Sequence, residues 1–262
     1  MAQDLFDSRL RSLRRDRAFR AGPELFLHER AFDDILERIA LVQRTFRSVL
    51  LIGCPDPSWR ERLLGIAGSV DVIEPGSRFA AAAGAFRDDE DRMELEPGAY
   101  DLCVAVGTLD TVNDLARALL IVRFALKEDS LFIGALSGGD TLPALRAAMR
   151  AADEVAGVAT PHVHPRIEPA ALAGLLGSAG FAMPVVDVDR VQASYASLPA
   201  LVRDLRAMAA TNILSARSKR PLSRAAVAAA ARQFLAGAQE ARVTERFELL
   251  HFAAWTPPPA NG

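Results

Sequence analysis

The sequence predicts an α/β fold with a doubly wound, mostly parallel sheet. Short, continuously apolar runs alternate with helical or loop stretches, which is typical of parallel strands covered by helices on both faces. Hydrophobic residues make up 50% of the 262-residue chain, enough to bury a large core. The strands expected in the parallel part of the sheet are residues 48–54, 69–75, 100–106 and 130–136.

Helical patterns precede and interrupt this sheet. Apolar residues in 8–47 recur at three- and four-residue spacings with charges opposite them, which predicts helices. The runs 183–195 and 246–255 predict two late strands, an antiparallel pair at one sheet edge, separated by an alanine-rich helical stretch. The expected organisation is an N-terminal helical extension over 1–47, a sheet domain over 48–256 containing a helical insertion over 196–243, and a disordered tail over 257–262.

Charge and hydropathy narrow the possible partners and location. The formal net charge of −2 gives no global electrostatic reason to expect nucleic acid or an anionic membrane. Arginines lie all around the predicted helix at 9–20, which favours a docked or solvated helix over a nucleic-acid surface. No run of about 18 uncharged apolar residues occurs, and the first residues lack the apolar core of a signal peptide. We therefore expect no nucleic-acid partner, no stable membrane insertion and a cytoplasmic location.

The cysteines and histidines do not predict a metal site. Cys54 and Cys103 both lie in apolar strand-like runs, so we expect free, buried thiols in a reducing compartment. His162 and His164 are two residues apart, but prolines flank them and no third ligand is nearby in the sequence. Structural or exposed histidines are the favoured interpretation.

Glycine and acidic residues follow the first predicted strands. Ligands of open parallel sheets bind beyond the carboxyl ends of the strands. Gly53 follows the first strand, where the backbone would turn under a ligand, and Glu74 follows the second, where a carboxylate could accept hydrogen bonds from both ribose hydroxyls. Asp88 and Asp89 precede the strand at 100–106, and one of them could face an adenine amine. The alternatives are a solvated carboxylate at Glu74 and an acidic surface loop.

The order of these features resembles a known enzyme superfamily. The two strand ends, the acidic loop, "AYDLCVAVGTLDTVNDLARALLIVRFALKEDSLFIGAL" and "LAGLLGSAGF" together resemble class I S-adenosylmethionine-dependent methyltransferases with a Rossmann-like fold. "LFDSRLRSLRRDRAF", "SGGDTLPALR", "PVVDVDRV" and "LVRDLRAMAATNILSARSKRPLSRA" are similar to one branch of it. That branch contains the mitochondrial complex I assembly factor that acts as a protein arginine hydroxylase, and it is related to the malonyl-carrier-protein methyltransferase of biotin synthesis.

The resemblance implies a set of cofactor contacts. Gly53 matches the first loop glycine, Glu74 the ribose carboxylate and Asp89 the adenine contact. Gly107 lies just past the strand at 100–106, where the methyl-transfer face is expected. No catalytic residue is implied.

The first loop departs from the family pattern. Leu51 occupies the usual acidic position, and Pro55 and Pro57 replace the second and third glycines. Proline has no N–H and a fixed φ, so the loop loses donors and freedom to approach a ligand. We therefore expect S-adenosylmethionine to bind weakly or not at all. Asp110 and Thr111 also stand where many relatives carry a His-Trp pair.

Three functions are compatible with these residues. The first is an enzyme that modifies a protein substrate, by arginine hydroxylation or methyl transfer, with a respiratory-complex subunit as the implied partner. The second is a non-catalytic assembly or binding protein that has lost the cofactor. The third is an active methyltransferase for a small molecule or carrier protein.

Two further segments have both structural and functional interpretations. Asp140 or Thr141 is expected to cap the helix that follows the strand at 130–136, with substrate contact as the alternative. Four polar residues of the helical insertion could form a lid or partner surface, or simply the polar side of an amphipathic helix. They are Arg203, Arg206, Asn212 and Arg217.

Overall fold

The computed structural model describes residues 4–259, which divide into two compact units. Each unit is assembled from three segments that are separated in the sequence. Strands β5 (Ala182–Tyr195) and β6 (Val243–Trp255) have residues in both. The predicted division at residue 47 stays a prediction. Of the described residues, the sheet unit comprises 25–138, 167–189 and 249–259, and the helical unit comprises 4–24, 139–166 and 190–248.

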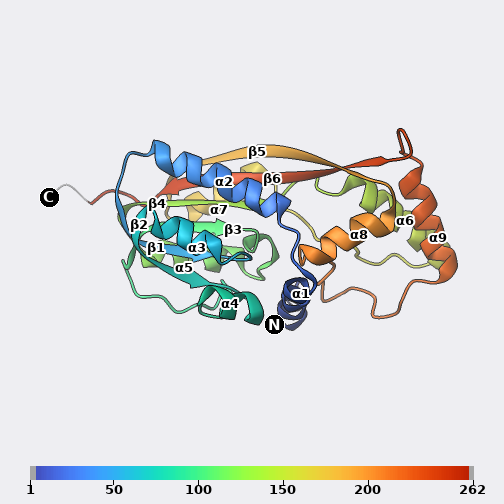
Figure 1. Cartoon of the computed structure of the whole chain (residues 1–262), viewed down its shortest axis with the longest axis horizontal. Coiled ribbons are helices and arrows are strands. Elements are labelled where there is room, and N and C mark those ends of the chain that lie inside the picture. Colours follow the sequence, from blue (N-terminus) through green and yellow to red (C-terminus); the bar gives the residue numbers. More distant parts are fainter. Residues whose placement is uncertain (1–3, 260–262) are drawn as a thin grey trace. The chain divides into compact units, whose positions relative to one another are not determined.

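One six-stranded sheet contains the strands of the described residues, in the order β2-β1-β3-β4-β6-β5 (Figure 1). β1 pairs in parallel with β2 and β3, and β3 pairs in parallel with β4. β6 runs antiparallel to β4. The predicted α/β class with a mostly parallel sheet is confirmed. The strands are Phe46–Ile52 (β1), Ala67–Ile73 (β2), Tyr100–Val106 (β3), Leu126–Ser137 (β4), Ala182–Tyr195 (β5) and Val243–Trp255 (β6).

The helices of the sheet unit cover the sheet on both sides. α2 packs against β3 and β4, with Phe32 and Ile35 fully buried. α5 and α7 contribute to a separate apolar cluster with alternate residues of the strands. They are Phe26–Leu41 (α2), Ser58–Leu64 (α3), Ser77–Ala83 (α4), Leu115–Ala125 (α5) and Pro169–Ser178 (α7), with a short 3-10 turn at Leu109–Thr111 (η1).

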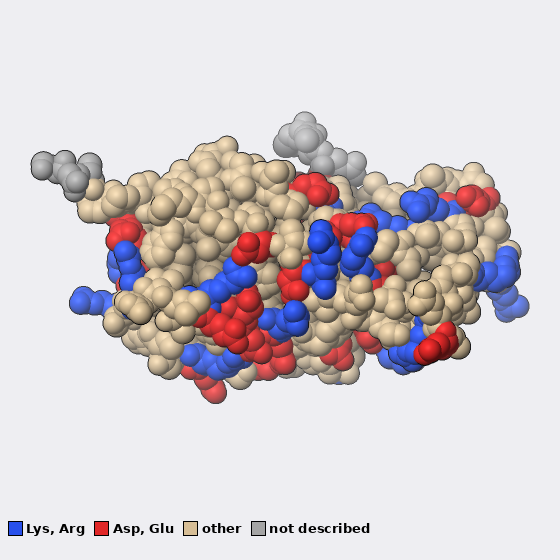
Figure 2. Space-filling model, turned by 90° about the horizontal axis from the view of Figure 1, so that it is seen from above, with Lys and Arg blue, Asp and Glu red and all other residues tan. Residues whose placement is uncertain are grey.

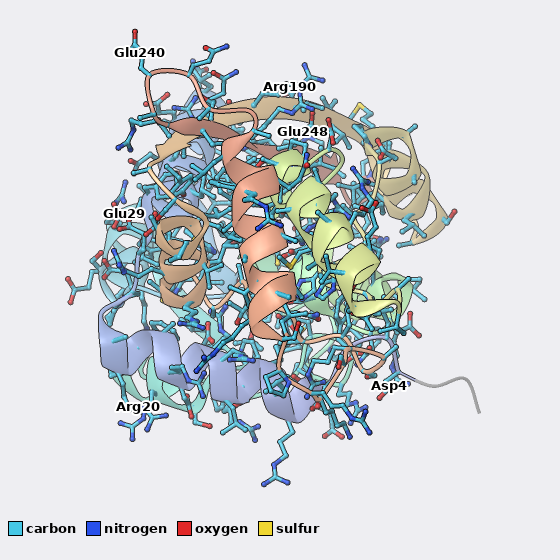
Figure 3. All side chains as sticks on the ribbon, turned by 90° about the vertical axis from the view of Figure 1, so that its right-hand side faces the viewer. Asp4, Arg20, Glu29, Arg190, Glu240 and Glu248 are labelled. Atoms are coloured by element: carbon cyan, nitrogen blue, oxygen red, sulfur yellow. The ribbon has the colours of Figure 1, made fainter. Side chains whose placement is uncertain are left out.

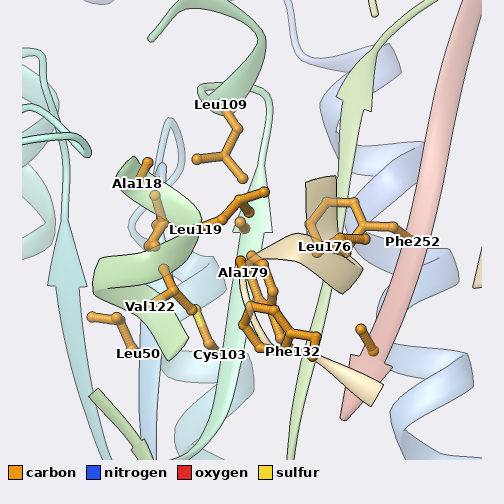
Figure 4. Packing of buried hydrophobic residues seen from close by; sticks show 14 of the residues in the cluster. Leu50, Cys103, Leu109, Ala118, Leu119, Val122, Phe132, Leu176, Ala179 and Phe252 are labelled. Carbon is orange, nitrogen blue, oxygen red and sulfur yellow. The ribbon is translucent and has the colours of Figure 1, made fainter. Parts of the chain in front are cut away.

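Aromatic side chains pack against one another within that cluster (Figure 4). The ring centroid of Phe132 on β4 lies 4.8 Å from that of Phe252 on β6 and 5.2 Å from that of Phe181. Cys103 and Leu176 pack in the same cluster. Because strand residues alternate between faces, His251 points to the opposite side of the sheet from Phe252.

The helical unit contains α1, α6, α8 and α9, and α6 packs extensively against α9 (Figure 3). α1 begins after Asp7, whose carboxylate accepts a hydrogen bond from the N–H of Leu10 at 2.9 Å. Arg11 and Arg15 of α1 are buried, so the arginine-rich helix is docked, one of the two forms that the sequence favours. The helices are Ser8–Ala21 (α1), Pro143–Ala156 (α6), Leu198–Ala207 (α8) and Arg224–Leu235 (α9).

The predicted cap of α6 is wrong. The helix begins after Leu142, and neither Asp140 nor Thr141 caps it. Instead, the fully buried carboxylate of Glu245 on β6 accepts hydrogen bonds from the first N–H groups of α6, at 2.9 Å from Leu145 and 3.2 Å from Ala144. A carboxylate that is distant in the sequence therefore caps α6 in place of a side chain next to the helix.

No helix of residues 4–259 is both long and apolar enough to cross a membrane. At the carboxyl end, the carbonyl of Pro257 accepts a hydrogen bond from the N–H of Asp129 at 3.1 Å. Residues 260–262 of the predicted disordered tail lie outside the described residues.

Candidate cofactor site

Gly53 forms a turn at the carboxyl end of β1 that no other residue type fits. Its φ is +83°, and a Cβ would lie 2.4 Å from the carbonyl oxygen of Val106 and 2.7 Å from Cγ2 of Thr108. Glycine alone combines this backbone conformation with the absence of a side chain. The turn after β1 therefore packs directly against the end of β3.

Glu74, at the end of β2, is fully buried and bonded to the backbone. Its Oε2 accepts a hydrogen bond from the N–H of Cys54 at 2.9 Å, and its Oε1 accepts one from the N–H of Gly76 at 2.7 Å. Charge-assisted hydrogen bonds of this length are strong and offset the cost of burying a carboxylate. Glu74, which the sequence predicts as a ribose contact, is thus hydrogen-bonded to the loops after β1 and β2.

The loop between β1 and α3 is a closed turn rather than an open glycine-rich one. Pro55 is buried, Pro57 immediately precedes α3, and the carboxylate of Asp56 accepts a hydrogen bond from the N–H of Ser58 at 2.8 Å. Cys54 is a free, fully buried thiol, as the sequence predicts, and its Sγ lies 3.1 Å from the carbonyl oxygen of Asp56. Pro55 is thus packed into the protein, while Pro57 is exposed at the start of α3.

Gly107, just past β3, contacts a histidine that the sequence analysis did not single out. Gly107 has a φ of +67°, and a Cβ would lie 2.4 Å from Cδ2 and 2.7 Å from Nε2 of His28 on α2. An imidazole therefore covers the strand end at which the methyl-transfer face is expected. The only sequence signal was a histidine within an otherwise apolar and acidic helix start, which is too common to mark a site.

An aromatic stack adjoins the first loop. Trp59, in the first turn of α3, stacks on Phe32 of α2 with ring centroids 4.3 Å apart and an angle of 8° between the planes. The guanidinium of Arg62 lies 4.9 Å from the Phe32 ring centroid. The Nε1 of Trp59 is buried and has no hydrogen-bond partner among residues 4–259. Stacking of this kind fixes α3, and the loop before it, against α2.

Asp89 follows a short extension of the sheet. Phe86 forms an isolated parallel bridge with Ile73 of β2, and its carbonyl accepts a hydrogen bond from the N–H of Glu74 at 3.0 Å. Asp89 lies three residues later and is half-buried, with its N–H bonded to the carboxylate of Asp88 at 2.8 Å. The structure thus brings the turn at Gly53 against the end of β2 before Glu74 and against Val106 and Thr108 on either side of Gly107, and it places the segment carrying Asp89 at the end of β2.

A second candidate region is a groove of about 770 Å³ between α2 and β5. Carboxylates outnumber arginines among its lining residues, and Figure 2 shows acidic and basic side chains gathered on the side of the molecule that carries these elements. The acidic members are Glu29, Asp33, Asp34, Glu37, Asp187 and Asp189.

Ion pairs join the two walls of this groove. Arg30 of α2 binds both carboxylate oxygens of Asp189 on β5, at 2.6 Å and 3.2 Å. Arg38 binds Asp34 at 2.6 Å and Asp187 at 2.7 Å. These pairs are partly exposed, so their individual contribution to stability is small.

His251 lies at the base of the groove and is only 3% exposed. Its Nδ1 is 2.9 Å from a carboxylate oxygen of Asp34. Burial lowers the pKa of His251 more than the attraction of Asp34 raises it, and the positive charge of Arg38 lowers it further, while Asp187 and Asp189 oppose this shift. The imidazole is thus held mainly in its neutral form.

The two histidines that the sequence analysis considered, His162 and His164, lie in the helical unit. His162 contacts the carboxylate of Asp153 at 2.8 Å and the hydroxyl of Thr160 at 3.0 Å. His164 is buried, and its Nε2 accepts a hydrogen bond from the N–H of Ile213 at 3.0 Å. Residues 4–259 contain no group of three or more metal-ligating side chains arranged to hold an ion.

Curated proteins provide clear sequence relatives. The chain is 31% identical to mitochondrial arginine-hydroxylase NDUFAF5 of Danio rerio over 248 residues, which covers 88% of this chain and 75% of that protein. It is 30% identical to the Mus musculus protein of the same name, over 97% of this chain and 78% of that protein. A malonyl-[acyl-carrier protein] O-methyltransferase of Nitrosospira multiformis is 29% identical over 78% of this chain and 62% of that protein.

Solved structures agree on the fold. The N-methyltransferase NodS of Bradyrhizobium japonicum matches 96% of this chain and all of that protein with a TM-score of 0.52 and 16% identity. Phosphoethanolamine N-methyltransferase 2 of Haemonchus contortus matches 86% of this chain and 52% of that protein with a TM-score of 0.53 and 14% identity. No model in a scan of protein families matches the chain. The mostly parallel sheet and the extended similarity together show that the chain belongs to the arginine-hydroxylase NDUFAF5 family, within the class I methyltransferase superfamily.

Proposed function

We propose that this chain is an enzyme that modifies a protein substrate, by hydroxylating an arginine or by transferring a methyl group. The observation that carries the proposal is the similarity to arginine-hydroxylase NDUFAF5, which spans 88% of this chain and 75% of that relative. The match to the malonyl-carrier-protein enzyme covers less of both chains. A respiratory-complex subunit is the proposed partner.

The acidic groove supports a protein substrate. Its lining carboxylates complement a basic segment, and arginine is the side chain whose planar fork best matches carboxylates. Arg30 and Arg38 already bind Asp34, Asp187 and Asp189, and Arg62 binds Asp33, so a basic segment would compete with these arginines for the carboxylates.

The strand-end residues fit S-adenosylmethionine only in part. Gly53 and Gly107 have the positive φ of turns beneath a ligand, but Val106, Thr108 and His28 occupy the space where their side chains would lie. The Glu74 carboxylate does not fit, since it is fully buried and held by the N–H groups of Cys54 and Gly76. We therefore propose weak cofactor binding, because contact with Glu74 requires the first loop to open and lose these hydrogen bonds.

Mass spectrometry of the substrate tests the activity. Arginine-containing peptides of respiratory-complex subunits should gain the mass of one oxygen, or of one methyl group, in cells that make this chain and not in cells that lack it. Methylation confined to a carrier-protein thioester would support the malonyl-type alternative instead.

A non-catalytic binding protein is the second candidate, favoured by the enclosed carboxylate of Glu74 and the closed proline loop. Calorimetric titration with S-adenosylmethionine and S-adenosylhomocysteine separates the two. Millimolar or weaker affinity with no modified peptide would support the binding protein, whereas submicromolar affinity would show that the loop opens readily and that our interpretation of it is wrong.

A further inference from the structure

A second pocket, of about 230 Å³, lies wholly within the helical unit. One part of its lining is apolar and includes Leu145 and Met149 of α6 and Leu205 of α8. Figure 3 shows α1, α6 and α8, which line the pocket together with the segments that follow α6 and α8. A water molecule occupies about 30 Å³ in the liquid, so the pocket has room for a molecule of roughly eight non-hydrogen atoms.

The polar part of the lining is positively charged. Arg14 of α1, Arg206 of α8 and Arg166 all line the pocket, and none of its lining residues among the described ones is acidic. Burial lowers the pKa of Arg14, and the positive charges of Arg17, Arg206 and Arg217 lower it further. Like charges held together in this way repel one another, and an anion would relieve that repulsion.

The nearby carboxylates are engaged elsewhere. Asp153 bonds with His162, and Asp7 contacts Arg217 at 3.4 Å. Glu245 attracts Arg146 but is itself bonded to the first N–H groups of α6. Among the lining residues, the pocket therefore carries arginines and no carboxylate.

Two buried donors at the pocket lack protein partners. The Nε of Arg14 and the Oγ of Thr211 are both shielded from solvent, and neither has a hydrogen-bond partner among residues 4–259. By contrast, Asn212 in the same lining donates to the carbonyl of Pro161 at 2.7 Å and accepts from the N–H of Leu214 at 2.9 Å. Unmade hydrogen bonds of buried groups are costly, so donors left this way indicate a place for an acceptor.

We propose that this pocket binds a small amphipathic anion, a carboxylate or phosphate group on a short apolar chain. The anionic group lies against Arg14, Arg206 and Thr211, and the chain packs on Leu145, Met149 and Leu205. The site is built from residues other than the strand-end glycines and Glu74, so it stands independently of cofactor binding.

Calorimetric titration of the full chain with four probes tests the site. Hexanoate and propyl phosphate supply the two anionic groups on molecules that match the size of the pocket, inorganic phosphate supplies the group alone, and hexanamide is the neutral counterpart of hexanoate. We expect one or both amphipathic anions to bind about tenfold or more tightly than hexanamide, because the arginines favour charge. The tighter of the two anions identifies the group. Equal binding of hexanamide, or no binding of any anion up to its solubility, would overturn the proposal.

Matched variants locate the binding. Arg14→Gln should weaken anion binding by about tenfold, whereas Arg9→Gln, on the exposed side of the same helix, should leave it unchanged. Thr211→Val should weaken binding by a few-fold through loss of one hydrogen bond. Equal losses in Arg14→Gln and Arg9→Gln would show that the anion responds only to overall charge, which would contradict a site in the pocket. Circular dichroism of each variant confirms that the fold is retained.

Discussion

The loop after β1 and the pocket of the helical unit bury polar groups in opposite ways. In the loop, both oxygens of the Glu74 carboxylate receive backbone N–H groups. In the pocket, the Nε of Arg14 and the Oγ of Thr211 have no partner among residues 4–259. A satisfied group stabilises the fold and an unsatisfied one destabilises it. Glu74, which the sequence predicts as a ligand contact, therefore stabilises the loop through its hydrogen bonds. The unpartnered donors of Arg14 and Thr211 lie in segments in which the sequence shows no ligand-binding motif.

Replacing Glu74 gives the sharpest test of its structural role. Glu74→Ala leaves the N–H groups of Cys54 and Gly76 buried without an acceptor, at about 1–3 kcal/mol each, so we expect a loss of about 2–6 kcal/mol in the free energy of unfolding. Urea denaturation measures it. The exposed Glu96→Ala should change stability by less than about 0.5 kcal/mol. Equal stability of both variants, with cofactor binding lost only in Glu74→Ala, would return Glu74 to a ligand role.

Gly53→Ala tests the close contact of β1 with β3. The variant must keep a positive φ and place a Cβ 2.4 Å from the Val106 carbonyl oxygen. Gly98 has a φ of +59° with nothing within 4 Å of its Cβ position, so Gly98→Ala isolates the backbone cost of about 1–2 kcal/mol. We expect thermal unfolding to show at least twice that loss for Gly53→Ala. Equal losses would mean that the strand ends separate easily, as an opening loop requires.

Two threonines provide a matched pair. The Oγ of Thr141 accepts a hydrogen bond from the N–H of Glu248 at 2.9 Å, whereas that of Thr211 has no partner among the described residues. Thr141→Val should therefore cost about 1–3 kcal/mol, and Thr211→Val should be neutral or slightly stabilising in the absence of ligand. Chemical denaturation of both variants gives the comparison. A large loss in Thr211→Val would reveal a structural partner and remove Thr211 from the proposed site.

The smallest expected effect concerns pH. Burial lowers the pKa of His251, so the unfolded chain binds this proton more readily than the folded one. Stability should fall as pH drops below about 6.5, the ordinary value for histidine. His251→Gln should reduce the decline in melting temperature between about pH 7.5 and pH 5.5, an effect of about 1 kcal/mol or less. The same decline in both proteins would show that folding does not lower the pKa of His251.

The fold was largely predictable from the sequence. The strand at Tyr100–Val106 coincides with the predicted run, because a continuously apolar segment of that length has few other stable environments. The cap of α6 was not predictable, since it comes from Glu245, about a hundred residues away. Sequence patterns that predict helix caps depend on residues within a few positions of the helix, so they do not identify a partner this far along the chain.

The candidate site was only partly predictable. Gly53 and Gly107 do lie at strand ends with positive φ, as turns beneath a ligand require. That Glu74 is enclosed could not be foreseen, because its partners are backbone N–H groups that every sequence possesses. His28 was missed because its contact with Gly107 depends on how α2 packs on the sheet. The assignments of Gly53, Glu74, Asp89 and Gly107 to a cofactor stay predictions.

The cap that Glu245 provides for α6 also bears on the order of folding. The first turn of α6 is complete only when a strand that ends at Trp255 is in place. During synthesis on a ribosome, α6 therefore emerges well before the carboxylate that stabilises its amino end. A chain released without β6 would carry an α6 with a frayed first turn, so this carboxylate makes completion of the helix depend on completion of the polypeptide.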